Sequence, residues 1–487
     1  MWPPTSPAGF PRRNVVGMRI AAIDQGTTST RALVVDTGDG TAVIAHAVRH
    51  AQSHPAPGWV EHDAEELLAN VRACLAAAGP VDALALANQG ESCLAWDAVT
   101  GEPLSPVIVW QDNRTAETVA GLADHAALVE ARAGLPLDAY FSASKLGWLL
   151  RHLPRVQAAR EAGRLRLGTT DAFFLDRLAG VFATDVATAS RTSLMELATG
   201  RWDPELCAVF GVPPDCLPEI RPTVGGFGRI GGVPVVASVV DQQAALYGHG
   251  CRAPGDAKIT FGTGAFALAV TGGEIVRGAG QGLLPTVAWA IGDATTYAVD
   301  GGVYDAGSAT EWAMRIGIVD DLSQLDGFET PLAIDRGLVF VPALSGLACP
   351  HWDRSAAALF LGMTAATTRA DLRQALLEGV ALRTAEVVAA IDARVPLAPS
   401  ISIDGGLSRS GYFAQVLADS LGREVVVGAF DERTAFGAAA LAASAFGIDL
   451  AAPVEARRHA PRGAEMREAR RTRFAEAVAR TRGWRAI

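Results

Sequence analysis

A polar segment near the start of the chain carries the residue types that bind phosphate groups. It consists of Asp24, Gln25, Gly26, Thr27, Thr28, Ser29, Thr30 and Arg31 and lies between two apolar, strand-like stretches. Gly26 allows a tight turn and a close approach of a ligand to the backbone. The hydroxyls of residues 27–30, the free backbone N–H groups and the Arg31 cation favour phosphate binding. Asp24 is placed to hold a hydrated Mg²⁺ against those phosphates. The alternative interpretation is an ordinary hairpin with a polar tip.

The apolar stretches on either side of this turn predict two strands, and the same pattern recurs later in the chain. Residues 256–271 again read as a strand, a Gly262-Thr263-Gly264 turn and a second strand. An internal repeat of this kind predicts two related lobes that face each other. Strands alternate with helices elsewhere, which indicates an α/β fold with mixed sheets. The predicted boundary near residue 250 gives an N-terminal lobe of residues 18–250 and a C-terminal lobe of residues 251–487.

The composition is typical of a globular protein that is too long for a single core. The chain has 487 residues, of which 49% are hydrophobic and 19% charged, and a net charge of −10, so two domains are expected. The negative charge argues against a general nucleic-acid binder. No apolar run reaches transmembrane length. Six scattered cysteines without a C-x-x-C pair indicate buried thiols in a reducing cytoplasm.

Two local biases in the sequence carry further predictions. Residues 1–17 are rich in proline and lack the apolar region of a secretory signal. We expect a disordered extension there, and a short tail docked on a lobe is the alternative. Of the 42 basic residues, only Lys145 and Lys258 are lysines. A lysine that is kept against such a bias suggests a need for its small ammonium group, with chance as the alternative.

Several motifs, in order along the chain, resemble those of one enzyme family. The chain lacks the lysine-containing P-loop, and its Asp-x-Gly-Thr-Thr turn instead resembles the phosphate loop of the actin, hexokinase and sugar-kinase superfamily. The segments IDQGTTSTR, HPAPGWVEHD, VIVWQDNRT, YFSASKLGWLL, VDQQAALYG, TFGTGAF and DGGLSRS resemble those of FGGY carbohydrate kinases, most of all glycerol kinases. The resemblance covers residues 19 to about 447. It implies a two-lobed, actin/hexokinase-like (ribonuclease H-like) fold with a central cleft that closes on ATP and a second ligand.

The resemblance implies transfer of the γ-phosphoryl group of ATP, with Mg²⁺, to a hydroxyl of a small polyol or sugar. Such a transfer needs a base near the hydroxyl, a metal on the phosphates and positive dipoles around the moving group. Asp241 matches the family's catalytic aspartate in the D-Q-Q-A-A motif. It follows the apolar residues 233–240 and opens a predicted helix over 242–247. The alternative for Asp241 is a helix N-cap, which is compatible with catalysis.

The same resemblance assigns the polyol-binding positions, which are Glu91, Trp110, Tyr140, Asp241 and Gln242. Both aromatic residues can supply apolar walls, with core packing as the alternative. The chain departs from the family at Gly90, where glycerol kinases carry an arginine. The missing guanidinium removes donors for substrate oxygens and is predicted to leave space. We therefore expect glycerol to be a poorer substrate than at least one longer polyol or ketose. The alternative is that Arg114 takes the place of the missing arginine.

ATP is expected to lie across the second lobe. Thr263 matches the family position that contacts the phosphates, and Gly307 and Glu311 match positions near the nucleotide, although the family often has glutamine at the latter. Gly406, with the glycine before it, lets the backbone approach the nucleotide. Ser410 takes the place of a frequent asparagine beside the adenine.

Three other functions stay open at this level: a pentulose or ketose kinase similar to xylulokinases, an actin-like ATPase, and a catalytically inactive sensor. The polyol-binding positions and the D-Q-Q motif favour a kinase over an ATPase. Retention of Asp24, Thr27, Arg31 and Asp241 argues against an inactive sensor. We expect a cytoplasmic enzyme with a small-molecule substrate and no nucleic-acid or membrane partner, assembled as a homodimer or homotetramer.

Overall fold

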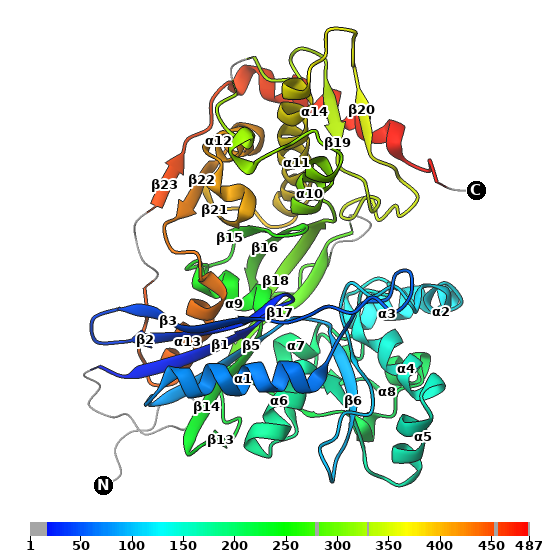
Figure 1. Cartoon of the computed structure of the whole chain (residues 1–487), viewed down its shortest axis with the longest axis vertical. Helices are drawn as coiled ribbons and strands as arrows, with labels where there is room; N and C mark the ends of the chain where they lie inside the picture. The colour runs from blue at the N-terminus through cyan, green and yellow to red at the C-terminus, as the bar shows by residue number, and fades with distance from the viewer. Residues whose placement is uncertain (1–16, 278–281, 329–330, 452–455, 486–487) are drawn as a thin grey trace.

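The computed structural model describes residues 17–277, 282–328, 331–451 and 456–485. It has two lobes, and Figure 1 draws the first lobe below the second. The chain colour passes from blue to green in the first lobe and from green to red in the second, except for the orange helix near residue 440, which lies on the first lobe. The predicted extension, residues 1–17, lies outside the described residues except for Gly17. No described helix is both long and apolar enough to cross a membrane.

The first lobe is built on a six-stranded mixed sheet in the order β13-β14-β5-β1-β2-β3. These strands are β1 (Arg19–Gln25), β2 (Ser29–Asp36), β3 (Ala42–Arg49), β5 (Ala83–Asn88), β13 (Arg229–Ile230) and β14 (Val233–Val240). β1 pairs antiparallel with β2 and parallel with β5, and β5 pairs parallel with β14. Because successive side chains of a strand point to opposite faces, Ile20 and Ala22 pack on one side and Ala21 and Ile23 on the other.

A second part of the first lobe holds the residues of the cleft wall. Its four-stranded sheet runs β4 (Glu61–His62), β7 (Val107–Ile108), β6 (Cys93–Asp97), β8 (Leu165–Thr169). The helices of the lobe are α1 (Ala64–Ala78), α2 (Ala116–Ala120), α3 (Ala126–Ala133), α4 (Ser142–His152), α5 (Pro154–Glu161), α6 (Thr170–Ala179), α7 (Val186–Ala189), α8 (Pro204–Phe210) and α9 (Asp241–Gly248). Short strand pairs join β9 (Ala183–Asp185) to β12 (Glu219–Arg221) and β10 (Met195–Glu196) to β11 (Arg201–Trp202).

The second lobe repeats the topology of the first sheet. Its seven strands run in the order β17-β18-β16-β15-β21-β22-β23. They are β15 (Ala257–Phe261), β16 (Ala265–Gly272), β17 (Leu284–Ile291), β18 (Ala294–Val303), β21 (Ser400–Gly405), β22 (Glu424–Gly428) and β23 (Ala456–His459). The other elements are α10 (Gly307–Arg315), β19 (Val339–Val341), β20 (Leu359–Leu361), α11 (Arg369–Asp392), α12 (Gly411–Leu421), α13 (Arg433–Ser444) and α14 (Ala464–Thr481).

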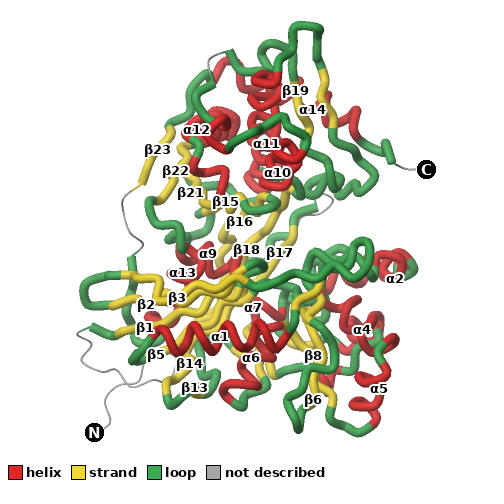
Figure 2. The backbone as a smooth tube through the Cα atoms, in the orientation of Figure 1, coloured by secondary structure: helices red, strands yellow, loops and turns green. Residues whose placement is uncertain are grey.

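The lobes are joined by two helices that cross at glycines. Although α13 comes late in the chain, it packs on the first sheet, opposite to α1, and against α9 (Figure 2). A Cβ on Gly437 would lie 1.8 Å from the carbonyl oxygen of Ala244, and a Cβ on Gly248 would lie 2.0 Å from that of Arg433. Both positions therefore need glycine, as close backbone contact requires. The lobe limits at residue 250 stay a prediction, but the packing shows that α13 is shared with the first lobe.

The C-terminal segment combines a strand with a helix that is partly buried. Residues 456–459 add strand β23 to the second sheet, and only then does α14 begin. One side of α14 buries Phe474, Ala477 and Val478 against the hairpin of β19 and β20. Arginines occupy many of the other positions of α14, and several of them bind carboxylates or carbonyls of the lobe.

Candidate active site

The turn between β1 and β2 places the predicted phosphate-binding residues at one end of two inner strands of the first sheet. Asp24 lies opposite to Arg31 in the strand register, and the turn is closed by the Gly26 N–H, which donates to the Ser29 carbonyl at 3.0 Å. Burial raises the pKa of Asp24 to about 7, although Arg31 opposes this. Arg31 is not a free cation, since its Nη1 lies 3.0 Å from Glu432 Oε2 at the start of α13.

The substrate-binding positions meet in one cavity of about 280 Å³ between the lobes. Its lining includes all five predicted polyol-binding residues, Glu91, Trp110, Tyr140, Asp241 and Gln242, together with Thr27, Thr28 and Thr263. Residues from both hairpin turns thus face the same space as the predicted base. This convergence of hydroxyls, carboxylates and aromatic rings is what a phosphoryl acceptor site requires.

Asp241 is the first residue of α9, directly after β14. The residue before it, Val240, is the N-cap and makes no side-chain capping bond, whereas Asp241 Oδ1 accepts the N–H of Gln242 at 2.7 Å. The pKa of Asp241 is raised to about 7, mainly by burial and also by the charges of Asp24 and Glu91, while Lys258 and the Gln242 N–H oppose the rise. A carboxylate with a pKa near neutrality can take up a proton during turnover.

The two aromatic residues form a wall of the cavity, and Tyr140 also packs against the hydrophobic core of the first lobe. Trp110 is half-buried, and its Nε1 donates to Thr27 Oγ1 at 3.0 Å, which ties the wall to the phosphate turn. Its ring contacts Tyr140 edge-on, with 5.5 Å between centroids, and faces Phe266 of the second lobe at 6.3 Å. The wall thus reaches across the two lobes.

Both lysines of the chain fix residues of this cavity. Lys145 donates to the carbonyls of Trp110 at 3.2 Å and Tyr140 at 2.7 Å. Lys258 donates to Gln242 Oε1 at 2.5 Å and to Thr260 Oγ1 at 2.8 Å. Both side chains are fully buried, and burial lowers the pKa of each. Their contacts support the prediction that these positions need a small ammonium group.

An arginine that the sequence did not single out lies in the same cavity. Arg191 follows α7 and is buried; its Nε donates to Glu91 Oε1 at 2.7 Å and its Nη2 to Asp300 Oδ2 at 3.2 Å. Although burial alone lowers the pKa of Arg191, Glu91 and Asp300 raise it above its usual value. Glu91 itself has a φ of 58°, which is uncommon for a residue with a side chain.

Arg191 corrects two expectations about Gly90. The cavity is not short of a guanidinium, because Arg191 supplies one. Arg114 does not take that role, since it is held by Asp112 and Glu61 with its side chain only 1% exposed. Gly90 also leaves little room for a Cβ, which would lie 2.9 Å from Val240 Cγ2. Both observations weigh against the reason for disfavouring glycerol, while the predicted order of substrates stays a prediction.

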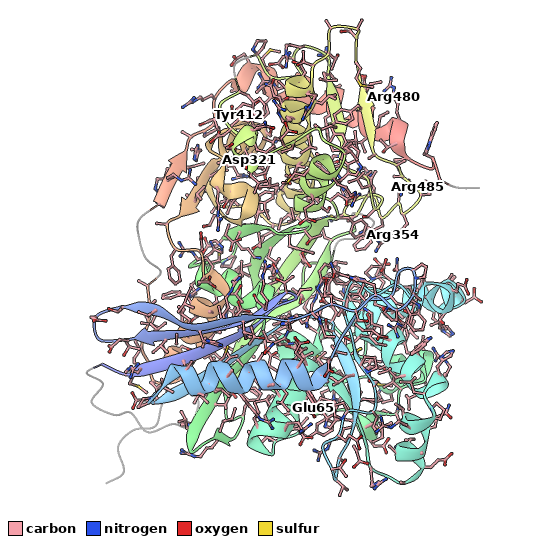
Figure 3. All side chains as sticks on the ribbon, viewed as in Figure 1. Glu65, Asp321, Arg354, Tyr412, Arg480 and Arg485 are labelled. Atoms are coloured by element: carbon pink, nitrogen blue, oxygen red, sulfur yellow. The ribbon has the colours of Figure 1, made fainter. Side chains whose placement is uncertain are left out.

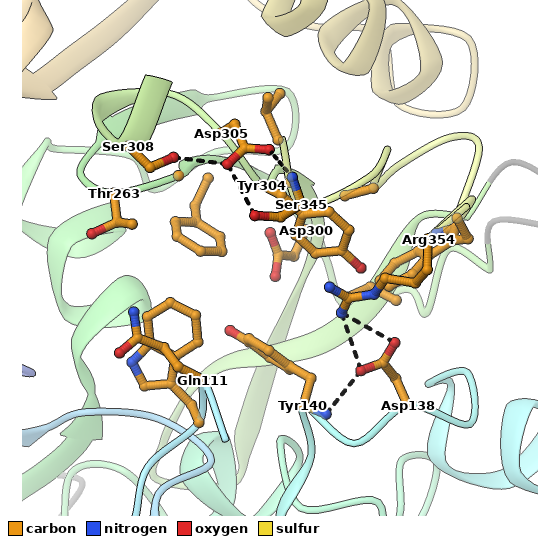
Figure 4. A pocket seen from close by; sticks show the side chains of 18 of the residues that line it. Gln111, Asp138, Tyr140, Thr263, Asp300, Tyr304, Asp305, Ser308, Ser345 and Arg354 are labelled. Carbon is orange, nitrogen blue, oxygen red and sulfur yellow. Dashed lines mark hydrogen bonds and ion pairs between the residues drawn. The ribbon is translucent and has the colours of Figure 1, made fainter. Parts of the chain in front are cut away.

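A second cavity, of about 220 Å³, adjoins the first and shares Trp110, Tyr140, Arg191, Phe266 and Asp300 with it. Figure 4 shows how Asp138 accepts the Tyr140 N–H and pairs with Arg354, at 2.8 and 3.4 Å. Arg354 lies on the second lobe where it meets the first (Figure 3). This pair therefore links the lobes beside the aromatic wall.

Unlike the polyol-binding residues, the predicted nucleotide-binding residues do not all line the first cavity. The N–H of Gly307, the first residue of α10, donates to the Gly262 carbonyl at 3.0 Å, and a Cβ there would lie 2.5 Å from that oxygen. Thr263 and Gly307 are thus brought together, with Glu311 exposed one turn later. Gly406 directly follows β21, which pairs with β15 beside this turn. Ser410 caps α12 and donates to the Leu325 carbonyl, so its hydroxyl already has partners.

Comparison with known proteins identifies the class. Residues 19–248 match the N-terminal domain of the FGGY family of carbohydrate kinases, and residues 257–446 match its C-terminal domain. The chain therefore belongs to the FGGY family of carbohydrate kinases. Like the rest of this family, it is an ATP-dependent phosphotransferase with an alcohol group of a small polyol or sugar as acceptor.

Within this family, the chain is similar to several glycerol kinases. The glycerol kinase of Alkalilimnicola ehrlichii is 41% identical over 89% of this chain and 91% of its own, and that of Thermus brockianus is 41% identical over 96% and 99%. Among solved structures, Plasmodium falciparum glycerol kinase with ADP superposes with a TM-score of 0.86 at 29% identity, covering 95% of this chain and 98% of its own. Rhodospirillum rubrum xylulose kinase gives 0.82 at 25% identity, over 95% and 98%.

Proposed function

We propose that the chain is a glycerol kinase that transfers the γ-phosphoryl group of ATP to a terminal hydroxyl of glycerol. The observation that carries this proposal is the small cavity in which Asp241, Glu91 and Arg191 face an aromatic wall beside the phosphate turn. The relatives near 40% identity are glycerol kinases. The ketose-kinase alternative has weaker support, since the xylulose kinases among the structural neighbours are only 20–25% identical.

In the proposed reaction Asp241 acts as the general base. Its carboxylate accepts the proton of the reacting hydroxyl while that oxygen bonds to the γ-phosphorus. The bond from this phosphorus to the bridging oxygen of ADP breaks, and ADP leaves with the electron pair. The substrate positions Trp110, Tyr140 and Gln242 hold the carbon chain and hydroxyls, and Lys145 and Lys258 fix their orientation.

The phosphates are proposed to lie between the two hairpin turns, near Thr27, Thr28, Ser29 and Thr263. Asp24 fits a magnesium ligand, because it is a buried carboxylate whose raised pKa would be relieved by a cation, and Mg²⁺ needs only one or two carboxylates beside phosphate oxygens. Bound with ATP, Mg²⁺ would neutralise charge on the phosphates. Arg31 stays a proposed contact of the phosphates, and its Nη1 also pairs with Glu432. Gly307, Glu311, Gly406 and Ser410 stay proposed contacts of the rest of the nucleotide.

Further proposals concern the setting of the enzyme. All six cysteines are buried, and none of them forms a disulfide within the described residues, which supports work in a reducing cytoplasm. The small-molecule substrate follows from the family, and assembly as a homodimer or homotetramer stays a prediction. The two lobes, divided near residue 250, are proposed to close on the substrates.

The test is a coupled assay of ADP release with purified protein, ATP and Mg²⁺, followed by phosphorus NMR of the product. We expect ADP release to depend strictly on glycerol and the product to be glycerol phosphate. ADP release at the same rate without any polyol would instead identify an ATPase. No release with any polyol or ketose would identify an inactive protein.

A further inference from the structure

Arg191, which lines the cavity, bridges carboxylates from both lobes. Arg191 binds Glu91 of the first lobe through Nε and Asp300 on β18 of the second lobe through Nη2. Its side chain is 4% exposed and that of Asp300 is 9% exposed. A guanidinium carries five N–H donors, so these two contacts leave part of its bonding capacity open.

Each partner of the Arg191–Asp300 ion pair has one polar atom with open bonding capacity. Among the described residues, neither Arg191 Nη1 nor Asp300 Oδ1 has a hydrogen-bond partner, and both atoms are buried. A buried polar atom without a partner is costly, so a partner is expected when the site is filled. Arg191 and Asp300 line both cavities, and the larger one also contains Asp241. Because both side chains line that cavity, a molecule bound there is placed to supply the partner.

A hydroxyl group matches this pair of atoms in kind. It can accept one hydrogen bond and donate another, while Nη1 can only donate and a carboxylate oxygen can only accept. We propose that Arg191 and Asp300 together bind a hydroxyl of the polyol other than the one that is phosphorylated. Arg191 is then a substrate-binding residue that sets specificity for a polyol with a second hydroxyl. This inference rests on the proposed function and deepens it.

The position of Gly90 agrees with this role. Gly90 lines the same cavity next to Glu91, and a side chain there would collide with Val240. The guanidinium therefore reaches the cavity from Arg191, which is 100 residues away from Glu91 in the sequence. Because Asp300 lies on the other lobe, a hydroxyl bound to both would also fasten the lobes to each other.

The experiment compares substrates that differ by one hydroxyl. Steady-state kinetics are measured with glycerol, with 1,2-propanediol, which lacks one terminal hydroxyl, and with 1,3-propanediol, which lacks the central one. The variants are Arg191→Met and Arg191→Lys. Arg423→Met is the matched control, because Arg423 also pairs with a carboxylate, that of Asp392, but lines neither of the two cavities.

We expect Arg191→Met to raise KM for glycerol about 10- to 100-fold, the effect of one hydrogen bond to a charged group, with KM for ATP nearly unchanged. The preference of the wild type for glycerol over at least one of the diols should fall by a similar factor. Arg191→Lys should recover only part of it, because an ammonium lacks the planar fork. Arg423→Met should keep the wild-type preference.

An unchanged preference in Arg191→Met, with glycerol and both diols losing equally, would overturn the inference and leave Arg191 a structural residue. If that variant does not fold, Asp300→Asn serves instead and must lower the same preference. The proposed function can fail independently of this inference. If the wild-type enzyme does not phosphorylate glycerol but does phosphorylate another polyol, the variants are compared on that polyol and its deoxy analogue. A wild type that phosphorylates no polyol overturns both.

Discussion

The two lobes share one strand topology but differ in the chemistry of their hairpins. In each, an antiparallel hairpin is flanked by further strands, with β1, β2, β5 and β14 corresponding to β15, β16, β21 and β22. The paired residues Asp24 and Arg31 of the first hairpin correspond in register to Thr260 and Phe266 of the second. The first hairpin thus carries the charges, and the second supplies a hydroxyl and an aromatic wall.

The same contrast holds where a helix follows the last central strand. In the first lobe, β14 leads directly into α9, whose first residue is Asp241. In the second lobe, β22 is followed by α13, whose start carries Glu432 paired with Arg31. The start of α9 therefore presents the Asp241 carboxylate to the substrate cavity. The start of α13 presents Glu432, which pairs with the Arg31 cation of the first hairpin. The two lobes thus share a fold but differ in role, and the difference comes from the side chains at equivalent positions.

Asp241→Asn should have the largest effect of any single change, because it removes the base from the catalytic helix start. We expect kcat to fall by about 10²–10⁴-fold, the usual contribution of general acid–base catalysis. The circular dichroism spectrum should be that of the wild type. Asp39→Asn, in an exposed turn, is the control. Near-normal turnover in Asp241→Asn would remove the distinction between the two helix starts.

Asp24→Asn tests the distinction between the hairpins. We expect KM for Mg-ATP to rise about tenfold or more, since a charged contact of roughly 1.5 kcal/mol or above is lost. Thr260→Val, the change at the corresponding position of the second lobe, should raise KM for Mg-ATP less. Titration of both variants with ATP at fixed Mg²⁺ measures the difference. Equal effects would mean that the charge of Asp24 has no special role.

The pH profile separates the neighbours of Asp241. Because its pKa is about 7 and the base must be unprotonated, kcat/KM for the polyol should rise with pH through neutrality. Lys258 lowers this pKa, so Lys258→Met should move the rising limb to higher pH. Asp24 raises it, so Asp24→Asn should move the limb to lower pH. Shifts in the same direction for both variants would contradict the assignment.

Gly90→Ala should have the smallest effect of the set. Its Cβ would lie 2.9 Å from Val240 Cγ2, and overpacking of this kind costs about 1–3 kcal/mol of stability. We expect a lower melting temperature and a modest rise in KM for the polyol. The double variant Gly90→Ala, Val240→Ala should recover much of the melting temperature. If Gly90→Ala instead raises the melting temperature, the contact with Val240 does not destabilise the protein.

The sequence predicted what depends on local pattern. Both hairpins follow from apolar stretches around a glycine turn, and the residues of the cavity follow from motifs in family order. Arg191 was missed because its partners Glu91 and Asp300 are each 100 residues or more away, and its own segment shows no pattern that marks a ligand. The close contact between Gly90 and Val240 was not predicted, because these residues lie far apart in the sequence and only the pairing of β5 with β14 brings them near each other.

The measurement that tests the central proposal most directly is kcat/KM for glycerol, erythritol, xylulose and ribulose with saturating Mg-ATP. The cavity of about 280 Å³, with Arg191 and Asp300 placed to bind a second hydroxyl, predicts that glycerol ranks first. If xylulose or ribulose ranks first, the glycerol kinase assignment is wrong and the chain is a ketose kinase of the same family.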